Sequence, residues 1–182
     1  MHARMKFMSE TATFAGGCFW CTEAIFQRLK GVEAVIPGYS GGDTQNSYEE
    51  VSQGTTGHAE SIQIIFDPKI VSYEELLLVF FKTHDPTSLN KQGADVGPQY
   101  RSAIFYHSQE QKDAAEQIIK KLTDEKVFDK PIVTEVSEFK SFFEAEEYHK
   151  NYYNNNKNAG YCQVVINPKL AKLEKEFGEK LK

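Results

Sequence analysis

Cysteine, tryptophan and long apolar runs are all scarce in this chain of 182 residues. Three cysteines, an odd count, do not make the structural disulfide framework of a small secreted protein. No stretch approaches the ~18 consecutive apolar residues of a membrane-spanning helix. The N-terminal residues Met1 to Glu10 include basic side chains but have no continuous apolar segment behind them. We therefore expect a cytoplasmic protein, in a compartment where thiols stay reduced, with no membrane contact.

A basic surface is also missing. The formal net charge is −5 and the lysines are spread along the chain, which argues against nucleic acid as a partner. There is no P-loop, dinucleotide fingerprint or internal repeat. With 40% hydrophobic and 26% charged residues, the chain is long enough for one substantial core but short for two. We expect one catalytic domain over residues 1–182, acting as a monomer, with a C-terminal coil and helix over residues 154–182.

The hydrophobic periodicity predicts strands and helices that intermix without strict alternation. Strands are predicted at about Thr11–Phe14, Val32–Tyr39, His58–Phe66, Tyr100–Tyr106 and Ile132–Ser137. Helices are predicted at about Phe19–Lys30, after capping boxes at Ser72 and Ser108, after a third box at Ser141 as far as Tyr153, and from Leu170 with Leu170, Leu173, Phe177 and Leu181 on one face. This pattern favours an α+β fold, a sheet covered by helices, over a doubly wound parallel sheet.

The stretch GGCFWCTEA, residues 16–24, places two cysteines at the start of a predicted helix. A free cysteine is most often simply buried. Cys18, however, follows two glycines and opens the helix, where unpaired N–H groups and the dipole stabilise a thiolate and lower its pKa. Structural zinc needs about four ligands, and beyond Cys18 and Cys21 only Cys162 and five histidines remain, in no second pair at ligand spacing. We therefore favour a reactive thiol without a metal, with a thioredoxin-like Cys-x-x-Cys oxidoreductase as the alternative.

A carboxyl group on the third predicted strand is the next candidate. Strand alternation places Glu60 on the apolar face with Ile62, Ile64 and Phe66. Burial disfavours the charged form, so the pKa of Glu60 should rise towards neutrality, as a general acid requires. The alternative is a glutamate that reaches solvent past the end of the strand. His58 lies on the same face, and we favour a structural role for it.

Other polar residues are weak signals when taken singly. Tyr48, Tyr100 and Asp95 gain weight only from their occurrence together with Cys18 and Glu60. A histidine in an aromatic stripe, His149, is an alternative base for acyl transfer, but no local sequence feature supports that role.

Five ordered blocks of this chain resemble the A-type peptide methionine sulfoxide reductases. They are GGCFWCTEA, SYEEVSQGTTGHAESIQIIFDP, HDPTSLNKQGADVGPQYRSAIFY, EAEEYHKNYY and GYCQVVINPK, and together they run from about Ala12 to Lys169. The resemblance implies reduction of the S epimer of methionine sulfoxide, free or in proteins. It also implies a ferredoxin-like two-layer α+β scaffold with a coiled C-terminal segment.

The resemblance assigns roles to matching positions. It implies Cys18 as the nucleophile, Glu60 as the acid that protonates the sulfoxide oxygen, Tyr48 and Tyr100 as hydroxyls that bind that oxygen, Phe19 and Trp20 as the cradle of the substrate methyl group, Asp95 as a contact for the substrate backbone, and Cys162 as the recycling cysteine. After the sulfoxide step Cys18 is a sulfenic acid, which a second thiol condenses into a disulfide.

Recycling departs from the commonest family pattern at one position. Many relatives have Gly where this chain has Cys21, and some with Cys there use it for recycling and lack the later Gly-Tyr-Cys; this chain has both. We expect Cys162 to attack first, because its glycine-flanked coil can move whereas Cys21 is held in the first helical turn. A Cys-x-x-Cys pair at a helix start can also close a disulfide, so both remain candidates. Thioredoxin is the expected external reductant, and no metal, flavin or nucleotide cofactor is required.

Overall fold

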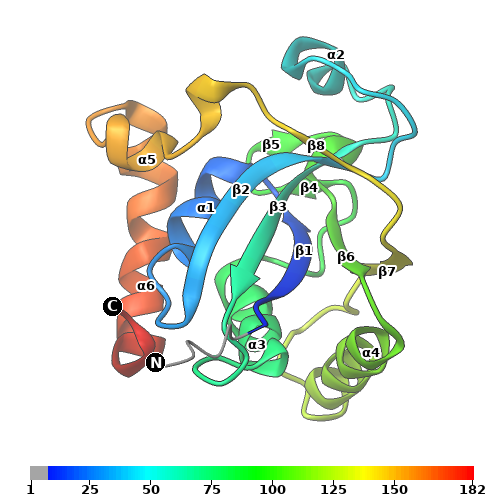
Figure 1. Cartoon of the computed structure of the whole chain (residues 1–182), viewed down its shortest axis with the longest axis vertical. Helices are drawn as coiled ribbons and strands as arrows, with labels where there is room; N and C mark the ends of the chain where they lie inside the picture. Colours follow the sequence, from blue (N-terminus) through cyan, green and yellow to red (C-terminus); the bar gives the residue numbers. More distant parts are fainter. Residues whose placement is uncertain (1–7) are drawn as a thin grey trace, which may run out of the picture.

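The computed structural model describes residues 8–182, and the first seven residues, to which most of the N-terminal prediction refers, lie outside the described part. Figure 1 shows a curved sheet with helices packed around it. The strands are β1 (Glu10–Gly16), β2 (Val32–Ser40), β3 (Ala59–Phe66), β4 (Lys91–Gln92), β5 (Asp95–Val96), β6 (Ser102–Tyr106), β7 (Glu135–Glu138) and β8 (Phe142–Glu144). The helices are α1 (Phe19–Phe26), α2 (Tyr48–Ser52), α3 (Tyr73–Thr83), α4 (Gln109–Asp124), α5 (Tyr152–Asn155) and α6 (Asn167–Phe177).

The main sheet has six strands in the order β7-β6-β1-β3-β2-β8. Neighbours among the four central strands are antiparallel. With α1 after β1 and α3 after β3 they form the β-α-β-β-α-β arrangement of a ferredoxin-like fold. The crossover helix α4 returns the chain so that β7 pairs in parallel with β6, and β8 pairs antiparallel with β2. The predicted α+β class with a mixed sheet is confirmed.

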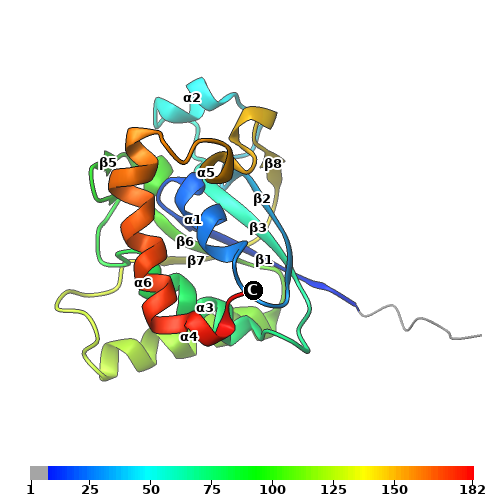
Figure 2. The same cartoon turned by 90° about the vertical axis from the view of Figure 1, so that its left-hand side faces the viewer.

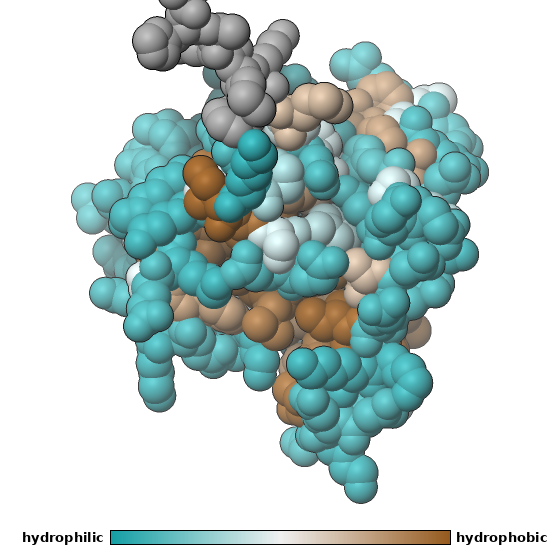
Figure 3. All heavy atoms as spheres, turned by 60° about the horizontal axis from the view of Figure 1, so that its bottom comes forward, coloured by the Kyte–Doolittle hydropathy of each residue, from teal (hydrophilic) through white to brown (hydrophobic). Residues whose placement is uncertain are grey.

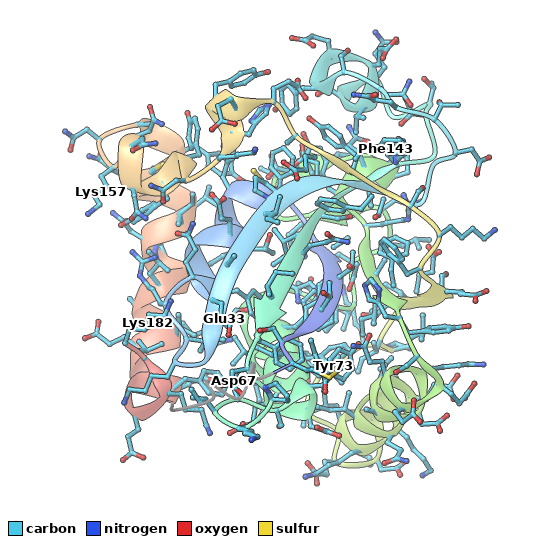
Figure 4. All side chains as sticks on the ribbon, in the orientation of Figure 1. Glu33, Asp67, Tyr73, Phe143, Lys157 and Lys182 are labelled. Atoms are coloured by element: carbon cyan, nitrogen blue, oxygen red, sulfur yellow. The ribbon has the colours of Figure 1, made fainter. Side chains whose placement is uncertain are left out.

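The register of the sheet brings three chain segments to one end. Phe14 near the end of β1 pairs with Ile62, and Tyr39 near the end of β2 pairs with Glu60 near the start of β3. The loop that follows β1 therefore leaves the sheet at the end that carries Glu60. This end is uppermost in Figure 1. Figure 4 shows Phe143 of β8 at this end and Tyr73 of α3 at the other.

Capping side chains start the longer helices where the sequence predicts. Ser72 accepts a hydrogen bond from the Glu75 N–H, and Glu75 accepts one from the Ser72 N–H, which makes a complete capping box for α3. At α4, Ser108 accepts a hydrogen bond from the Gln111 N–H, but the Gln111 side chain accepts one from the His107 N–H and not from the Ser108 N–H, so the box is incomplete. A further box, Ser47 with Glu50, opens α2, which the sequence analysis did not predict.

The C-terminal helix α6 packs along α1 and α3 (Figure 2). Leu173 is fully buried, and Leu170 and Phe177 pack against the same core, which confirms the predicted face for these three residues; Leu181 also packs there but lies beyond the end of α6, bridged to Leu29. Beyond the helix, the Lys30 N–H donates to the Lys180 carbonyl at 2.8 Å and the Lys182 N–H donates to the Arg28 carbonyl at 2.9 Å. The last residues of the chain are thus fixed to the turn between α1 and β2.

Two predicted elements are wrong. The capping box expected at Ser141 starts no helix, because Phe142–Glu144 pairs with β2 as strand β8, and only a 3-10 turn at Glu147–His149 and the short α5 follow. Pairing at the sheet edge overrides the local helix signal. The segment around Cys162 is not a coil: Cys162–Ile166 is a π-helical turn that runs directly into α6.

The lower end of the sheet carries none of the predicted site residues. A groove of about 710 Å³ lies there between the start of β1 and the first turns of α3 and α4, with Thr11, Tyr73 and His107 in its wall. Figure 3, which brings this side forward, shows hydrophobic residues in a recess surrounded by hydrophilic ones. Across residues 8–182 no helix is long and apolar enough to span a bilayer. Candidate chemistry therefore concentrates at the upper end.

Candidate active site

Cys18 occupies the N-cap position of α1, directly after a tight turn. Its φ and ψ of −58° and 126° are non-helical, and its side chain is only 8% exposed. Gly17 before it has a φ of +88°, and a Cβ at that position would lie 2.6 Å from the Gln92 side chain. Only glycine fits this close approach without strain. The turn thereby places the Cys18 thiol at the N-terminus of α1, as the sequence predicts.

The predicted pKa of Cys18 is wrong in direction for the substrate-free protein. Burial raises the pKa of the Cys18 thiol well above its ordinary value, and a hydrogen bond with Cys21 and the charge of Glu60 add to this. The backbone N–H of Trp20 acts in the expected opposite sense but is outweighed. Cys18 therefore rests as a thiol, and its proton must leave before it attacks.

Cys21 lies one helical turn beyond Cys18, with its N–H donating to the Cys18 carbonyl at 3.1 Å, and each thiol shifts the pKa of the other. The neighbouring Cys18 thiol lowers the pKa of Cys21. The positive charge of Lys169 lowers it further, and the Tyr161 hydroxyl oxygen lies 3.6 Å from the Cys21 sulfur. Of the two neighbouring thiols, Cys21 is the one that ionises first.

Glu60 lies beside these thiols and is 2% exposed. One carboxyl oxygen accepts a hydrogen bond from the Phe19 N–H, the first residue of α1, at 3.0 Å. Burial raises the pKa of Glu60 to about 8, because the helix N–H and a hydrogen bond with Cys18 compensate only part of the desolvation. The predicted inward face and raised pKa are both confirmed, and Glu60 is a protonated acid at neutral pH.

Two tyrosine hydroxyls complete this polar cluster. Tyr48 opens α2, and Tyr100 ends the 3-10 turn Pro98–Tyr100. Burial and the charges of Glu60 and Cys18 raise the pKa of both, that of Tyr48 to about 12, so both remain neutral donors. The structure thus gathers the predicted hydroxyls around the thiol and the acid.

Aromatic rings form the wall next to Cys18. Phe19 is fully buried, with its ring centroid 6.3 Å from that of Tyr48 and 5.0 Å from that of His149. Trp20 is half-buried and stacks on Tyr152 at 3.7 Å. The Trp20 indole N–H donates to Nδ1 of His149 at 3.0 Å. His149 therefore fixes the orientation of the indole and is no partner for a cysteine in acyl transfer.

Asp95 reaches the site from the small hairpin of β4 and β5. The Tyr161 hydroxyl donates to its carboxylate at 2.7 Å and also contacts the Cys21 sulfur. Gln92 ties the base of the hairpin to the Asp85 backbone through two hydrogen bonds of 2.9 and 3.0 Å. The structure thus holds Asp95 next to Tyr161, whose hydroxyl also contacts the Cys21 sulfur.

Two glutamates that the sequence analysis missed hold the site together, Glu23, which is buried, and Glu146, which is half-buried. Glu146 accepts from the Tyr39 hydroxyl at 3.0 Å and from the Tyr48 N–H at 3.1 Å. Glu23 on α1 accepts from the N–H groups of Asn151 and Tyr152 at 3.0 and 3.3 Å. The segment between β8 and α5 is therefore fixed at two places, at Glu146 and at Asn151 with Tyr152. The only sequence signal for Glu23 is a carboxylate on a helix that is otherwise apolar.

His58 has the structural role that the sequence favours. Its Nδ1 accepts from the Gly42 N–H at 3.1 Å, and its Nε2 lies 2.6 Å from the Thr44 carbonyl. Through these two contacts the His58 ring holds the loop between β2 and α2 in place. Among residues 8–182, no three histidine, cysteine or acidic side chains gather as metal ligands would.

Comparisons with known proteins agree with this geometry. The family model described as Peptide methionine sulfoxide reductase matches residues 10–181. The chain is 55% identical over 174 residues, 95% of its length and 84% of the relative's, to a peptide methionine sulfoxide reductase MsrA of Deinococcus radiodurans. The reduced form of Mxr1 from Saccharomyces cerevisiae superposes with a TM-score of 0.79 at 32% identity, covering 89% of this chain and 95% of that one.

A further solved structure is Mxr1 in complex with Trx2, which matches with a TM-score of 0.57 at 25% identity over 84% of this chain and 92% of that one. The residues matched by the family model include Cys18, Cys21, Glu60 and Cys162. The chain belongs to the peptide methionine sulfoxide reductases of the A type, enzymes that reduce methionine sulfoxide.

Proposed function

We propose that this enzyme reduces the S epimer of methionine sulfoxide, free or in proteins, with Cys18 as the nucleophile and Glu60 as the acid. The observation that carries the assignment is the position of the Glu60 carboxyl, which is 2% exposed and accepts the N–H of Phe19, the residue after Cys18, and whose pKa burial raises to about 8. A sulfoxide oxygen is a poor leaving group, so it must gain a proton as the sulfur is attacked. A buried acid next to a thiol supplies that proton.

The first step starts with the proton of Cys18. It passes to Cys21, the neighbouring thiol with the lower pKa, and the Cys18 thiolate attacks the substrate sulfur. Glu60 gives its proton to the sulfoxide oxygen. The substrate S–O bond and the new bond between the two sulfurs then break as the oxygen passes with this proton to the Cys18 sulfur, which leaves Cys18 as a sulfenic acid and releases methionine. The hydroxyls of Tyr48 and Tyr100 hold the oxygen as charge develops on it, the kind of preorganised stabilisation that commonly contributes most to rate.

Substrate position follows from the remaining residues. Phe19 and Trp20 offer an apolar surface to the methyl group, with Trp20 held by His149 and Tyr152. Asp95 accepts an N–H of the substrate backbone. No cofactor is required, because the thiols supply both electrons.

Turnover ends with disulfide formation among the cysteines and reduction by thioredoxin. The Mxr1 complex with Trx2 supports thioredoxin as the reductant, and free thiols at Cys18, Cys21 and Cys162 suit the reducing cytoplasm. The test is single-turnover reduction of the separated S and R epimers without added reductant. We expect about one methionine per protein from the S epimer and a loss of two thiols; methionine from neither epimer would refute the proposal.

A further inference from the structure

All three methionines of this chain lie within its first eight residues, at positions 1, 5 and 8. Residues 9–182 contain none, although methionine is an ordinary residue of protein cores. The core is built instead from aliphatic and aromatic side chains together with the three cysteines. Oxidation turns the apolar methionine side chain into a polar one and disrupts a core that contains it. The fold of this enzyme therefore has no internal methionine for an oxidant to damage.

Met8, by contrast, is open to solvent. It is 87% exposed, and Ser9 and Glu10 after it are exposed as well, whereas the three cysteines are buried. Figure 2 shows the start of β1 extending beyond the body of the molecule. A peroxide in solution therefore reaches the Met8 sulfur more readily than the sulfur of any cysteine.

We propose that peroxide oxidises Met8 and that the S epimer of the resulting sulfoxide is reduced at the Cys18 of a second molecule of this enzyme. The inference rests on the proposed function, since it uses the same reaction. One peroxide oxygen passes to the Met8 sulfur, which loses two electrons, and water leaves. Two thiols of the second molecule return those two electrons as they form a disulfide, and the oxygen leaves as water. Met8 is thus a modification site, and its partner is a second copy of the chain.

The sheet keeps Met8 away from the Cys18 of its own molecule. Strand β1 lies between them, and its pairing with β3 and β6 holds it in place. Its seven residues span about 20 Å at about 3.3 Å for each step. Met8 lies two residues before Glu10, and two residues of extended chain reach about 7 Å at most. The remaining gap is longer than the two side chains together, so only another molecule can supply the reacting thiol.

The backbone at Met8 is free to enter a binding site. The pairing of β1 with β3 begins at Glu10, so the sheet does not hold the backbone of Met8. Ser9 donates a hydrogen bond to the Glu33 carboxylate at 2.7 Å, in an exposed position where water can replace it. Met8 can therefore offer a backbone N–H to Asp95 of the second molecule and its methyl group to the aromatic wall beside Cys18.

An inactive target tests transfer between molecules. Cys18→Ser is oxidised with hydrogen peroxide, its remaining thiols are restored with dithiothreitol, and a catalytic amount of wild-type enzyme is added with fresh dithiothreitol. Trypsin releases residues 7–28, in which Met8 is the only methionine, and fragment masses place the oxygen on Met8. The substitution distinguishes the target peptide from the wild-type peptide by mass. We expect about half of the oxidised Met8 to return to methionine, because peroxide makes both epimers and the enzyme reduces one, and no change without wild-type enzyme.

Ile70 provides a matched position on the same target. It is also exposed, at 62%, but its N–H donates to the Asp67 carbonyl at 3.0 Å in a turn. With Ile70→Met added to the target, residues 70–82 form a second peptide with a single methionine. Its sulfoxide should be reduced about fivefold more slowly than that of Met8, because one backbone hydrogen bond must open first. Equal rates at the two positions would overturn the claim that the free backbone at Met8 favours it as a substrate.

A parallel assay with the S epimer of free methionine sulfoxide separates this inference from the proposed function. Met8→Leu enzyme should reduce the free sulfoxide at the wild-type rate, since Met8 lies at the far end of β1 from the thiols. Persistence of the Met8 sulfoxide while the free S epimer is reduced would overturn the self-repair inference alone. Failure on both substrates would overturn the proposed function and this inference with it.

Discussion

Replacement of Glu60 by Gln tests the acid assignment most sharply. The amide matches the carboxyl in size, and its oxygen can still accept the Phe19 N–H, so the helix start and the fold should persist. It has no acidic proton to give. At 2% exposure, water has little room to replace that proton. Loss of one such donor costs about 10²- to 10³-fold, or about 2.7–4 kcal/mol of barrier.

The pH dependence provides a second, independent measurement. The acid form of Glu60 is present below its pKa of about 8, so roughly nine-tenths is protonated at pH 7 and about one-tenth at pH 9. The wild-type rate of methionine formation in single turnover should therefore fall as pH rises through about 8. In Glu60→Gln this alkaline fall due to the carboxyl should disappear, and the whole profile should lie lower.

A matched control is available in Glu23→Gln. Glu23 is equally buried and has a pKa raised to about 7, but its two oxygens accept only the backbone N–H groups of Asn151 and Tyr152, and the amide oxygen of Gln keeps one of these bonds. Its single-turnover rate should stay within about twofold of wild type, since conservative changes away from the reacting atoms are usually small in effect. Wild-type rates for Glu60→Gln across neutral pH, with Glu23→Gln also unchanged, would refute the acid role.

Further predictions concern the oxygen-binding hydroxyls, recycling and the C-terminal helix. Tyr48→Phe and Tyr100→Phe should each slow methionine formation by about 10- to 100-fold in single turnover, less than Glu60→Gln because one hydroxyl remains, and an unchanged rate in both would exclude them from the oxygen site. Cys162→Ser should form about one methionine per protein yet fail to cycle with thioredoxin; full steady-state turnover would give recycling to Cys21 alone. Leu173→Ala should lower the free energy of unfolding by about 2–5 kcal/mol in urea titration, because Leu173 is fully buried; a loss below 1 kcal/mol would show that α6 contributes little to the core.

Features set by local chemistry were predictable from the sequence. The capping boxes at Ser72 and Ser108 mark helix starts because a side chain and a backbone N–H three residues apart pair with each other. The inward face of Glu60 follows from the two-residue period of a strand. These patterns need no knowledge of what packs from elsewhere.

Features set by distant contacts were not predictable. Ser141 to Glu144 has the spacing of a capping box, but β2, about a hundred residues earlier, pairs with it as a strand. His149 meets Trp20 across 129 residues of chain, and nothing near His149 marks it as the acceptor of an indole N–H. The helix-start rule for Cys18 failed for the same reason, since burial under other elements outweighs a local N–H.

The π-helical turn Cys162–Ile166 lies between two parts of the chain that are fixed to the rest of the fold. Upstream, the Asn151 and Tyr152 N–H groups are held by Glu23; downstream, α6 is fastened through Leu173 and the bonds of Lys180 and Lys182. A π turn holds more residues per turn than an α turn because its hydrogen bonds span five residues instead of four. Each residue released from it into extended chain gives up to about 3.5 Å of reach. Unwinding of this turn would therefore lengthen the segment that carries Cys162 while both ends of the segment stay in place.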